Sequence, residues 1–266
     1  MTAPIAVTIA GSDSGGGAGI QADLKTFAAL GVFGASVITA LTAQNTRGVT
    51  AIHDVPADFV TAQMDAVFAD FDVHAVKIGM LSRPAVIEAV AAGLADRAHR
   101  NVVVDPVMIA TSGDRLLAPE AVDVLRRELL PRALIITPNL PEAAALLDTS
   151  IAESETDMRD QAERLLALGA RAVLLKGGHG AGPESVDIFL DGTAELRLPA
   201  PRIATSHTHG TGCTLSSAIA AGLAKRLPLA EAVVQAKAYV TLAIATAGRL
   251  EVGTGRGPVH HFHAWW

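Results

Sequence analysis

Short apolar runs alternate along this chain with longer segments in which apolar residues recur every three or four positions. The short runs are mainly aliphatic and β-branched, and they have the length of strands that are covered on both faces. The longer segments have the period of amphipathic helices. This alternation is typical of a parallel sheet with crossover helices. Strands are predicted at Ile5–Ala10, Ala35–Leu41, Ala75–Ile78, Asn101–Val104, Leu134–Thr137 and Ala172–Leu175.

Most of the predicted helices lie between these strands, and two more follow them. Pro84 and Pro119 suit the first turn of a helix, and Gly31 and Gly169 come directly after two of the expected helix ends. Helices are predicted at Ile20–Leu30, Ala57–Phe68, Pro84–Ala98, Pro119–Leu129, Asp157–Leu168, Thr211–Ala224 and Leu229–Ala247.

The pattern changes in the last third of the chain. Asp191 and Gly192 separate the runs Ser185–Leu190 and Thr193–Leu198, which predicts a hairpin with a two-residue turn. No repeat, linker or block of charge divides the sequence, so residues 1–266 are expected to form one domain. We predict an α/β fold, a three-layer α/β/α sandwich with a mostly parallel central sheet and an antiparallel hairpin at one edge.

Composition and charge narrow the class of protein. Of the 266 residues, 50% are hydrophobic and only 4% are aromatic, as expected for small-residue helices packed on a sheet. The formal net charge of −6 argues against a nucleic-acid partner. No uninterrupted apolar run reaches the ~18 residues that a membrane span needs, and we expect no membrane partner. The single cysteine allows no internal disulfide, which favours a soluble cytoplasmic enzyme.

Chemically capable side chains follow the predicted strands. In open parallel sheets, ligands bind beyond the carboxyl ends of the strands, so these side chains are candidates for one site. Asp105 and Glu142 together suit a magnesium ion held by one or two carboxylates and several waters. The alternative interpretation is that both are solvated loop acids. The candidates at strand ends are Gln44, Met80, Asp105, Asn139, Glu142 and Lys176.

Two glycine-rich stretches stand out as backbone surfaces. Gly11–Gly19 can be aligned with a dinucleotide-binding fingerprint, but the ribose-binding carboxylate expected ~20 residues later is missing. It is better interpreted as a wall that a flat substrate can approach, the alternative being a flexible turn. His209–Thr214 runs into an apolar helix, so its amides and the helix dipole form a place for an anion. Cys213 lies in the first turn, where a thiol pKa can fall below ~8.5, unless the residue is simply part of the core.

Seven motifs occur in order along nearly the whole chain, each at a predicted strand end or helix start. They are Ala10–Asp23, Thr42–Asn45, Lys77–Met80, Asp105–Met108, Thr137–Glu142, Lys176–His179 and His209–Thr214. On these motifs the chain resembles the ribokinase-like superfamily, and within it the hydroxymethylpyrimidine and phosphomethylpyrimidine kinases of thiamine biosynthesis. The resemblance implies a ribokinase-like fold, ATP and Mg²⁺ as cofactors, and a homodimer. It also implies two successive phosphorylations, of 4-amino-5-hydroxymethyl-2-methylpyrimidine and then of its monophosphate.

The resemblance also implies a role for each matching residue. Gln44 would bind the amino-and-nitrogen edge of the pyrimidine. Asp105 and Glu142 would organise magnesium, and Lys176 would face the phosphates. Gly11, Met80 and Val107 would line the ring pocket, and Gly210, Gly212 and Cys213 would form the anion hole. Nucleotide contacts would come from Asp105, Asn139, Glu142, Lys176 and Thr211.

Cys213 occupies the position at which many ribokinase-like sugar kinases carry an aspartate base. Phosphoryl transfer depends mainly on positioning and charge stabilisation, so a strong base is not essential. An ionised phosphate oxygen, the nucleophile of the second step, needs no base. We hypothesise that a neutral thiol lets one site accept both an alcohol and a phosphate, because it does not repel the phosphate.

Other functions remain open from the sequence alone. A pyridoxal or pyridoxine kinase of the same superfamily would use a similar ring and hydroxymethyl group. A nucleotide-dependent reductase belongs to a different class, and the missing ribose carboxylate counts against it. A non-catalytic vitamin-binding protein would not need Asp105, Glu142, Lys176 and Cys213 together.

Overall fold

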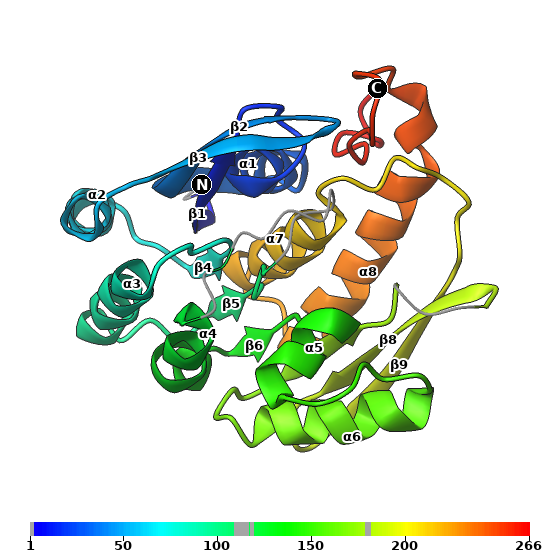
Figure 1. Ribbon diagram of the computed structural model, residues 1–266. Coiled ribbons are helices and arrows are strands. Elements are labelled where there is room, and N and C mark those ends of the chain that lie inside the picture. The colour runs from blue at the N-terminus through cyan, green and yellow to red at the C-terminus, as the bar shows by residue number, and fades with distance from the viewer. Residues whose placement is uncertain (1–2, 109–116, 118–119, 179–181) are drawn as a thin grey trace.

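The strands form one sheet, in the order β3-β2-β1-β4-β5-β6-β7-β8-β9 (Figure 1). The structure is a computed structural model, and it describes residues 3–108, 117, 120–178 and 182–266. Its strands are β1 (Ile5–Asp13), β2 (Phe33–Asn45), β3 (Gly48–Asp54), β4 (Ala75–Ile78), β5 (Val102–Val104), β6 (Ile135–Ile136), β7 (Val173–Lys176), β8 (Glu184–Leu190) and β9 (Glu195–Pro201).

The centre of the sheet is parallel, as predicted. β2, β1, β4, β5, β6 and β7 run in the same direction, and every predicted strand of the parallel part is present. The aliphatic residues of β4, β5 and β6 are completely or almost completely buried. Continuous apolar runs are therefore strands covered on both faces, which is why the sequence pattern located them.

Both edges of the sheet are antiparallel. The predicted hairpin is confirmed, but the predicted two-residue turn is wrong, because the four residues 191–194 connect β8 and β9. In this connection the Asp191 carboxylate accepts hydrogen bonds from the amides of Thr193 and Ala194. At the opposite edge β3 pairs antiparallel with an extended β2, and this second hairpin was not predicted. β3 is a mostly exposed edge strand, so burial imposed no apolar pattern on its sequence.

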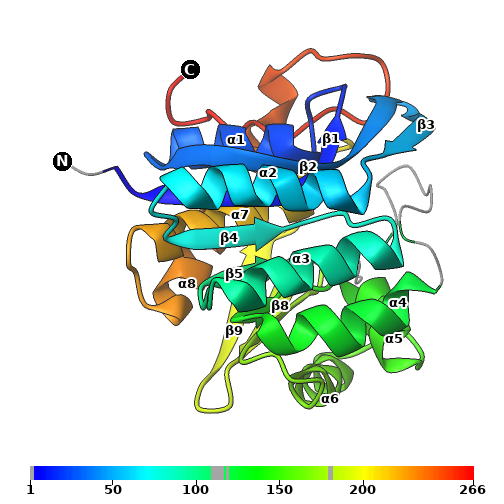
Figure 2. The same ribbon diagram turned by 90° about the vertical axis from the view of Figure 1, so that its left-hand side faces the viewer.

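Helices cover both faces of the sheet (Figures 1 and 2), which confirms the three-layer α/β/α sandwich. One face carries α1 (Gly19–Ala29), α7 (Thr211–Ala224) and α8 (Leu229–Ala245). The other carries α2 (Ala57–Asp70), α3 (Pro84–Asp96), α4 (Ala121–Val124), α5 (Leu140–Leu147) and α6 (Glu155–Leu166). α7 is buried along almost its whole length and packs under β1, β4 and β5.

Two helices differ from the sequence prediction. α5 was not predicted, although Pro141 lies in its first turn, where proline is well tolerated. There the Asn139 side chain accepts from the Glu142 amide, and Glu142 accepts from the Asn139 amide, which makes a capping box. The predicted helix Pro119–Leu129 is described from Ala121 on, where α4 continues as a π-helical turn; Pro119 lies outside the described residues.

The segment Leu229–Arg249, which contains α8, has the length and mean hydropathy of a membrane span. Its inward face belongs to the core that it shares with α7, through residues such as Val233, Ala236 and Val240. Lys237 of this helix pairs with Asp187 of β8 at 2.8 Å. The apolar composition is therefore accounted for by packing against α7 and the sheet, and one such helix is only a weak indication of a membrane segment.

Candidate active site

A buried ion cluster lies where the central parallel strands end. Lys176, the last residue of β7, places its Nζ 2.8 Å from the Asp105 carboxylate and 3.9 Å from that of Glu142. Asp105 directly follows β5 and also accepts a hydrogen bond from Thr137 at 3.0 Å. A Cβ built on Gly212 would lie 3.2 Å from Lys176 Nζ and 3.3 Å from Asp105 Oδ2. The predicted convergence of strand ends with the glycine turn before α7 is therefore present in the structure.

Burial dominates the electrostatics of this cluster. It raises the pKa of Glu142, and although the Lys176 charge lowers that pKa, the nearby Asp105 raises it again. Burial alone would lower the pKa of Lys176, but Asp105 and Glu142 outweigh burial and raise it. The ammonium of Lys176 thus lies beside two buried carboxylates that favour positive charge. Carboxylate oxygens are the ligands that Mg²⁺ prefers, so Asp105 and Glu142 fit a magnesium ion that keeps several waters.

Replacing Glu142 by glutamine should remove a pH dependence of stability. Because the folded pKa of Glu142 is raised above its unfolded value of about 4.5, this group stabilises the fold fully below that value and loses its effect as the pH rises through the folded pKa. The side-chain oxygen of the introduced glutamine can keep the capping box. We therefore expect the melting temperature of ligand-free Glu142→Gln to fall less than that of the natural protein between pH 5 and pH 8, in calorimetry.

Glu142→Gln should also lose activity, although it keeps its stability better at high pH. With one carboxylate of the cation site gone, kcat is expected to fall about 10²-fold. Glu88→Gln, which removes an exposed acid from α3, is the matched control and should change neither property. Equal melting curves for Glu142→Gln and Glu88→Gln at every pH would show that Glu142 is not protonated by burial.

The turn before α7 packs directly against the first glycine loop. Gly210, the N-cap of α7, has φ +80°, and a Cβ on it would overlap the carbonyl oxygen of Gly17. The cap has no side chain, so the first-turn amides at Gly212 and Cys213 are left to a ligand. Thr211, a predicted nucleotide contact, lies in this turn and donates its hydroxyl to the Thr208 carbonyl at 2.7 Å.

Cys213 is part-buried in the first turn of α7, and the Gly19 amide lies near enough to lower the pKa of its thiol. The expectation of a lowered thiol pKa is wrong. Desolvation raises the pKa of Cys213 to about 11, and the nearby carboxylates of Asp23 and Asp105 act in the same direction, against the charge of Lys77. Cys213 is therefore a neutral thiol at physiological pH, which is the state that the acceptor hypothesis requires.

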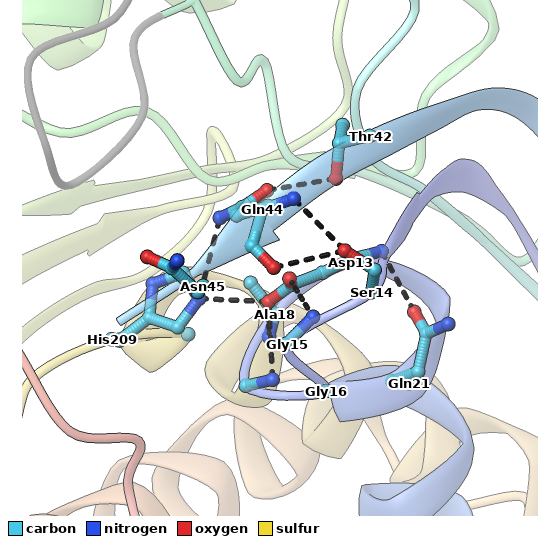
Figure 3. Close-up of polar contacts among 12 residues, drawn as sticks. Asp13, Ser14, Gly15, Gly16, Ala18, Gln21, Thr42, Gln44, Asn45 and His209 are labelled. Carbon is cyan, nitrogen blue, oxygen red and sulfur yellow. Dashed lines mark hydrogen bonds and ion pairs between the residues drawn. The ribbon is translucent and has the colours of Figure 1, made fainter. Parts of the chain in front are cut away.

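Asp13 organises the first glycine loop (Figure 3). Its carboxylate accepts from the amides of Gly15, Gly17 and Ala18, and from His209 Nε2 at 2.8 Å. Burial alone would raise the pKa of Asp13, but His209 and the amides outweigh it and hold that pKa low. The ionised carboxylate can only accept, so His209 Nε2 must carry the proton between them. The pair ties the glycine loop to the residue before Gly210.

Gln44 lies at the end of β2, beside this pair. Its amide nitrogen is 3.4 Å from His209 Nε2, and its amide oxygen accepts from the Thr42 hydroxyl at 3.0 Å (Figure 3). Ser14 bonds to the main chain of Gln44 in both directions. A cleft of about 380 Å³ opens here, and Gln44, Arg47, Ser206 and His209 are among the residues that line it. The glycine loop thus holds the main chain of Gln44, and Thr42 holds the side-chain amide that was predicted to bind a heteroaromatic ring.

The remaining predicted residues lie between Gln44 and Lys176. A Cβ on Gly11 would be 3.2 Å from the Met80 sulfur, and the Met80 carbonyl is held by the Thr39 hydroxyl at 2.8 Å. Val107 follows Asp105, to whose carbonyl its amide donates. Asn139 bridges to Lys176 through the backbone. His179, the last residue of a motif, lies outside the described residues.

Comparison with known proteins shows the family of the chain. The sequence pattern of the family described as phosphomethylpyrimidine kinase matches residues 13–260. The chain is 66% identical to the hydroxymethylpyrimidine/phosphomethylpyrimidine kinase of Rhizobium meliloti (strain 1021), over 100% of this chain and 99% of that protein. It is 56% identical to the corresponding protein of Escherichia coli (strain K12), over 98% of each. The chain belongs to the phosphomethylpyrimidine kinase family.

Membership of the phosphomethylpyrimidine kinase family confirms the resemblance found in the motifs. Among solved structures, the ADP complex of Bacillus subtilis pyridoxal kinase superposes with a TM-score of 0.92 at 37% identity, covering 99% of both chains. That likeness confirms the fold and shows that a pyridoxal kinase is a structural relative of this family member. The chain is far more similar to the pyrimidine kinases, at 66% and 56% identity, than to this pyridoxal kinase, so we group it with the pyrimidine kinases.

Several residues that shape this family member's site were not predicted to have a role. Asp13 and His209 were parts of motifs only, although an aspartate before a glycine run commonly accepts from the following amides. Lys77 is a lysine inside the buried strand Ala75–Ile78, and a charge in such a strand requires a buried partner. That partner is Asp23, at 2.9 Å.

Proposed function

We propose that this chain transfers the γ-phosphoryl group of ATP first to 4-amino-5-hydroxymethyl-2-methylpyrimidine and then, from a second ATP, to the resulting monophosphate. In each step an acceptor oxygen bonds to the γ-phosphorus while the bond to ADP breaks. The first step releases the hydroxyl proton, and the second uses a phosphate oxygen that is already ionised. The family membership carries this proposal, together with the position of Lys176 and Asp105 against the first turn of α7.

The residues divide this work between two ends of the site. Gln44 would bind the pyrimidine edge, with Gly11, Met80 and Val107 around the ring. The amides at Gly210, Gly212 and Cys213 would hold the transferred phosphoryl group, whose charge Lys176 would balance. Nucleotide contacts would come from Asn139 and Thr211, beside Asp105 and Glu142. Asp105 and Glu142 would also hold magnesium, which supplies charge neutralisation on the phosphates when bound.

Phosphorus NMR with ATP, magnesium and the hydroxymethylpyrimidine tests the proposal directly. Monophosphate should appear first and diphosphate afterwards, with two ADP formed for each diphosphate. Omitting magnesium should stop both steps. Adding pyridoxal to the same reaction measures how fast this alternative acceptor is phosphorylated relative to the hydroxymethylpyrimidine. Conversion of pyridoxal in preference to the pyrimidine, or ATP hydrolysis with no phosphorylated acceptor, would contradict the proposed function.

Replacing Gln44 by leucine should weaken binding of the pyrimidine. Leucine has a similar size but neither donor nor acceptor, so the ring's polar edge is left unpaired. That loss is worth roughly 1–3 kcal/mol, and KM for the hydroxymethylpyrimidine should rise about 10- to 10²-fold, measured by ADP release. KM for ATP should stay unchanged. Gln235→Leu removes an exposed amide from α8 and serves as the control. If Gln44→Leu and Gln235→Leu have the same KM for the hydroxymethylpyrimidine, Gln44 does not bind the acceptor.

We also propose that the protein acts as a homodimer in the cytoplasm. The edge hairpin of β2 and β3 leaves Leu41 exposed on one face and Ile52 on the other, and a second copy packed around this edge would cover both. The single cysteine suits a reducing compartment. Analytical sedimentation of the natural protein and of the variant Leu41→Lys/Ile52→Lys tests this proposal. If the hairpin forms the dimer interface, the variant should have half the mass of the natural protein.

A further inference from the structure

A segment near the C-terminus returns to the ring-binding end of the site. Residues 253–259, which we call the C-terminal clamp, follow α8 and lie beside the β2–β3 hairpin (Figure 1). Three segments line the cleft of about 380 Å³ that opens at Gln44. They are the β2–β3 turn, the stretch before α7 that includes His209, and the clamp, through residues such as Gly255. The phosphoryl transfer proposed above does not involve the clamp.

One side of the clamp holds the β2–β3 turn. The amide of Gly255 donates to the Thr46 hydroxyl at 3.1 Å, and the amide of Arg256 donates to the Thr46 carbonyl at 2.8 Å. In the other direction, the Arg47 guanidinium donates from Nε and Nη2 to the Thr254 hydroxyl, at 2.9 and 2.7 Å. These bonds fix the turn at the end of β2.

The other side of the clamp holds His209. The His209 amide donates to the Gly257 carbonyl at 3.1 Å, and the Val259 amide donates to the His209 carbonyl at 3.2 Å, so the two segments pair like short parallel strands. Just beyond the clamp, the His260 amide donates to the Ala243 carbonyl of α8 at 2.9 Å. The clamp is thus attached to the helix layer as well as to both segments.

Glycine at every second position lets the clamp lie this close to its neighbours. A Cβ on Gly253 or Gly255 would overlap Thr46, and a Cβ on Gly257 would overlap the His207 ring. The first half of the clamp is mostly exposed. Burial of apolar area therefore does not account for the close contact with the turn.

The two segments that the clamp joins carry side chains that meet in the site. Gln44 and His209 are 165 residues apart in the chain, and their side-chain Nε2 atoms lie 3.4 Å apart. From the glycine loop, Asp13 holds His209 and Ser14 holds the main chain of Gln44. The clamp connects the same two segments a second time, through backbone bonds to Thr46 and His209.

We propose that the C-terminal clamp positions the Gln44 amide for the acceptor ring, with Gly255 and Thr46 as the positioning residues. The clamp fixes the β2–β3 turn and His209 relative to α8, so the polar edge of the ring meets an amide that is already in place. It therefore sets the affinity for both acceptors, which share this ring, and leaves the ATP end of the site unaffected. The effect on acceptor binding rests on the proposed function, whereas the contacts that join the two segments do not.

Gly255→Ala tests the clamp at its closest contact with the turn. The added methyl group would overlap the Thr46 carbonyl oxygen, so the clamp and the turn must separate. KM for the hydroxymethylpyrimidine and KM for its monophosphate should each rise about tenfold, while kcat falls by less than about threefold and KM for ATP stays unchanged. Gly248→Ala adds a methyl group where no described atom lies within 4 Å, and it is the matched control. Thr46→Val removes only the hydroxyl acceptor and should raise the same two KM values about threefold, so it replaces the first variant if that variant does not fold.

A double variant shows whether the clamp acts through Gln44. If it does, adding Gly255→Ala to Gln44→Leu should change the two KM values by less than about twofold, because the amide that the clamp positions is already absent. Two effects that multiply would show that the clamp acts apart from Gln44. If Gly255→Ala and Thr46→Val both have the KM values of Gly248→Ala, the clamp does not position the acceptor site. Either of these results would overturn the proposal.

Hydrogen exchange tests the contacts of the clamp without any substrate. In Gly255→Ala, the amides of residues 44–48 and 206–210 should exchange about tenfold faster than in Gly248→Ala, whereas those of residues 191–194 should keep their rate. Equal exchange in the two variants would contradict a clamp that holds both segments. If the natural protein phosphorylates neither acceptor, the proposed function fails, and the exchange comparison still decides whether the clamp fixes the two segments.

Discussion

Gly210→Ala is expected to lower kcat for both phosphorylations by about 10²- to 10³-fold, because it displaces the first-turn amides of α7. Gly210 caps this helix with φ +80°, a conformation that residues with a Cβ rarely adopt. The added methyl group would also overlap the Gly17 carbonyl oxygen. One of the two backbones must therefore move. Gly17 is held by Asp13 and in contact with His209, so the displacement also reaches the loop that holds Gln44.

A second glycine variant distinguishes the effect of the strained φ from that of the overlap with Gly17. Gly192 in the β8–β9 turn has the same φ of +80°, and a Cβ on it would meet no atom within 4 Å. Gly192→Ala therefore introduces the same backbone strain without the overlap. Both variants should lose comparable stability from the strained φ, in urea unfolding, but only Gly210→Ala should lose kcat. If Gly210→Ala keeps its activity, the close approach of Gly17 and Gly210 does not position the anion hole.

The parallel core was predictable because burial acts on every residue of a central strand. The runs Ala75–Ile78 and Asn101–Val104 are aliphatic for this reason, and they appear as β4 and β5. β3 has no such constraint, because water covers most of it, and only its pairing with β2 makes it a strand. α5 depends on a capping box between Asn139 and Glu142, two residues that were interpreted as ligands rather than as helix signals.

Part of the site was predictable for a geometric reason. Parallel strands end at a common edge, so Asp105 and Lys176 could be expected to lie close together although 71 residues separate them. No periodic pattern pairs Asp13 with His209 across 196 residues, or Lys77 with Asp23 across 54. These pairs depend on the packing of α1, α7 and the glycine loops, which a single sequence does not specify.

The raised pKa of Cys213 could not be predicted from the sequence either. A cysteine in a first helical turn suggested a stabilised thiolate, because the helix dipole favours negative charge there. Desolvation outweighs the dipole in this fold, and the carboxylates of Asp23 and Asp105 add to it. The neutral thiol that results fits an acceptor site that receives a phosphate as well as an alcohol.

Cys213→Asp should therefore impair the second phosphorylation selectively. The new carboxylate would lie in the first turn of α7, where the amides and the Lys77 cation favour its charged form, whereas desolvation and the carboxylates of Asp23 and Asp105 oppose it. The ordinary pKa of an aspartate is roughly 4 to 5 units below that of a cysteine, so the introduced side chain should still be ionised near neutral pH. Two like charges at ~4 Å in partly screened surroundings repel each other by roughly 1–4 kcal/mol. The kcat/KM for the monophosphate should fall by between about fivefold and about 10³-fold. The alcohol carries no charge to repel, and the aspartate can accept its proton, so the first step should be largely retained.

Separate assays of the two half-reactions measure this difference, with the hydroxymethylpyrimidine or its monophosphate as the only acceptor. Cys213→Ser is the matched control, since a hydroxyl has nearly the same size as the thiol and is neutral. It should keep the ratio of the two kcat/KM values close to that of the natural protein, even if both values decrease. An aspartate variant that slows both steps by the same factor would show that Cys213 only fills space. Selective loss of the second step in Cys213→Asp but not in Cys213→Ser would instead assign the thiol's function to its lack of charge.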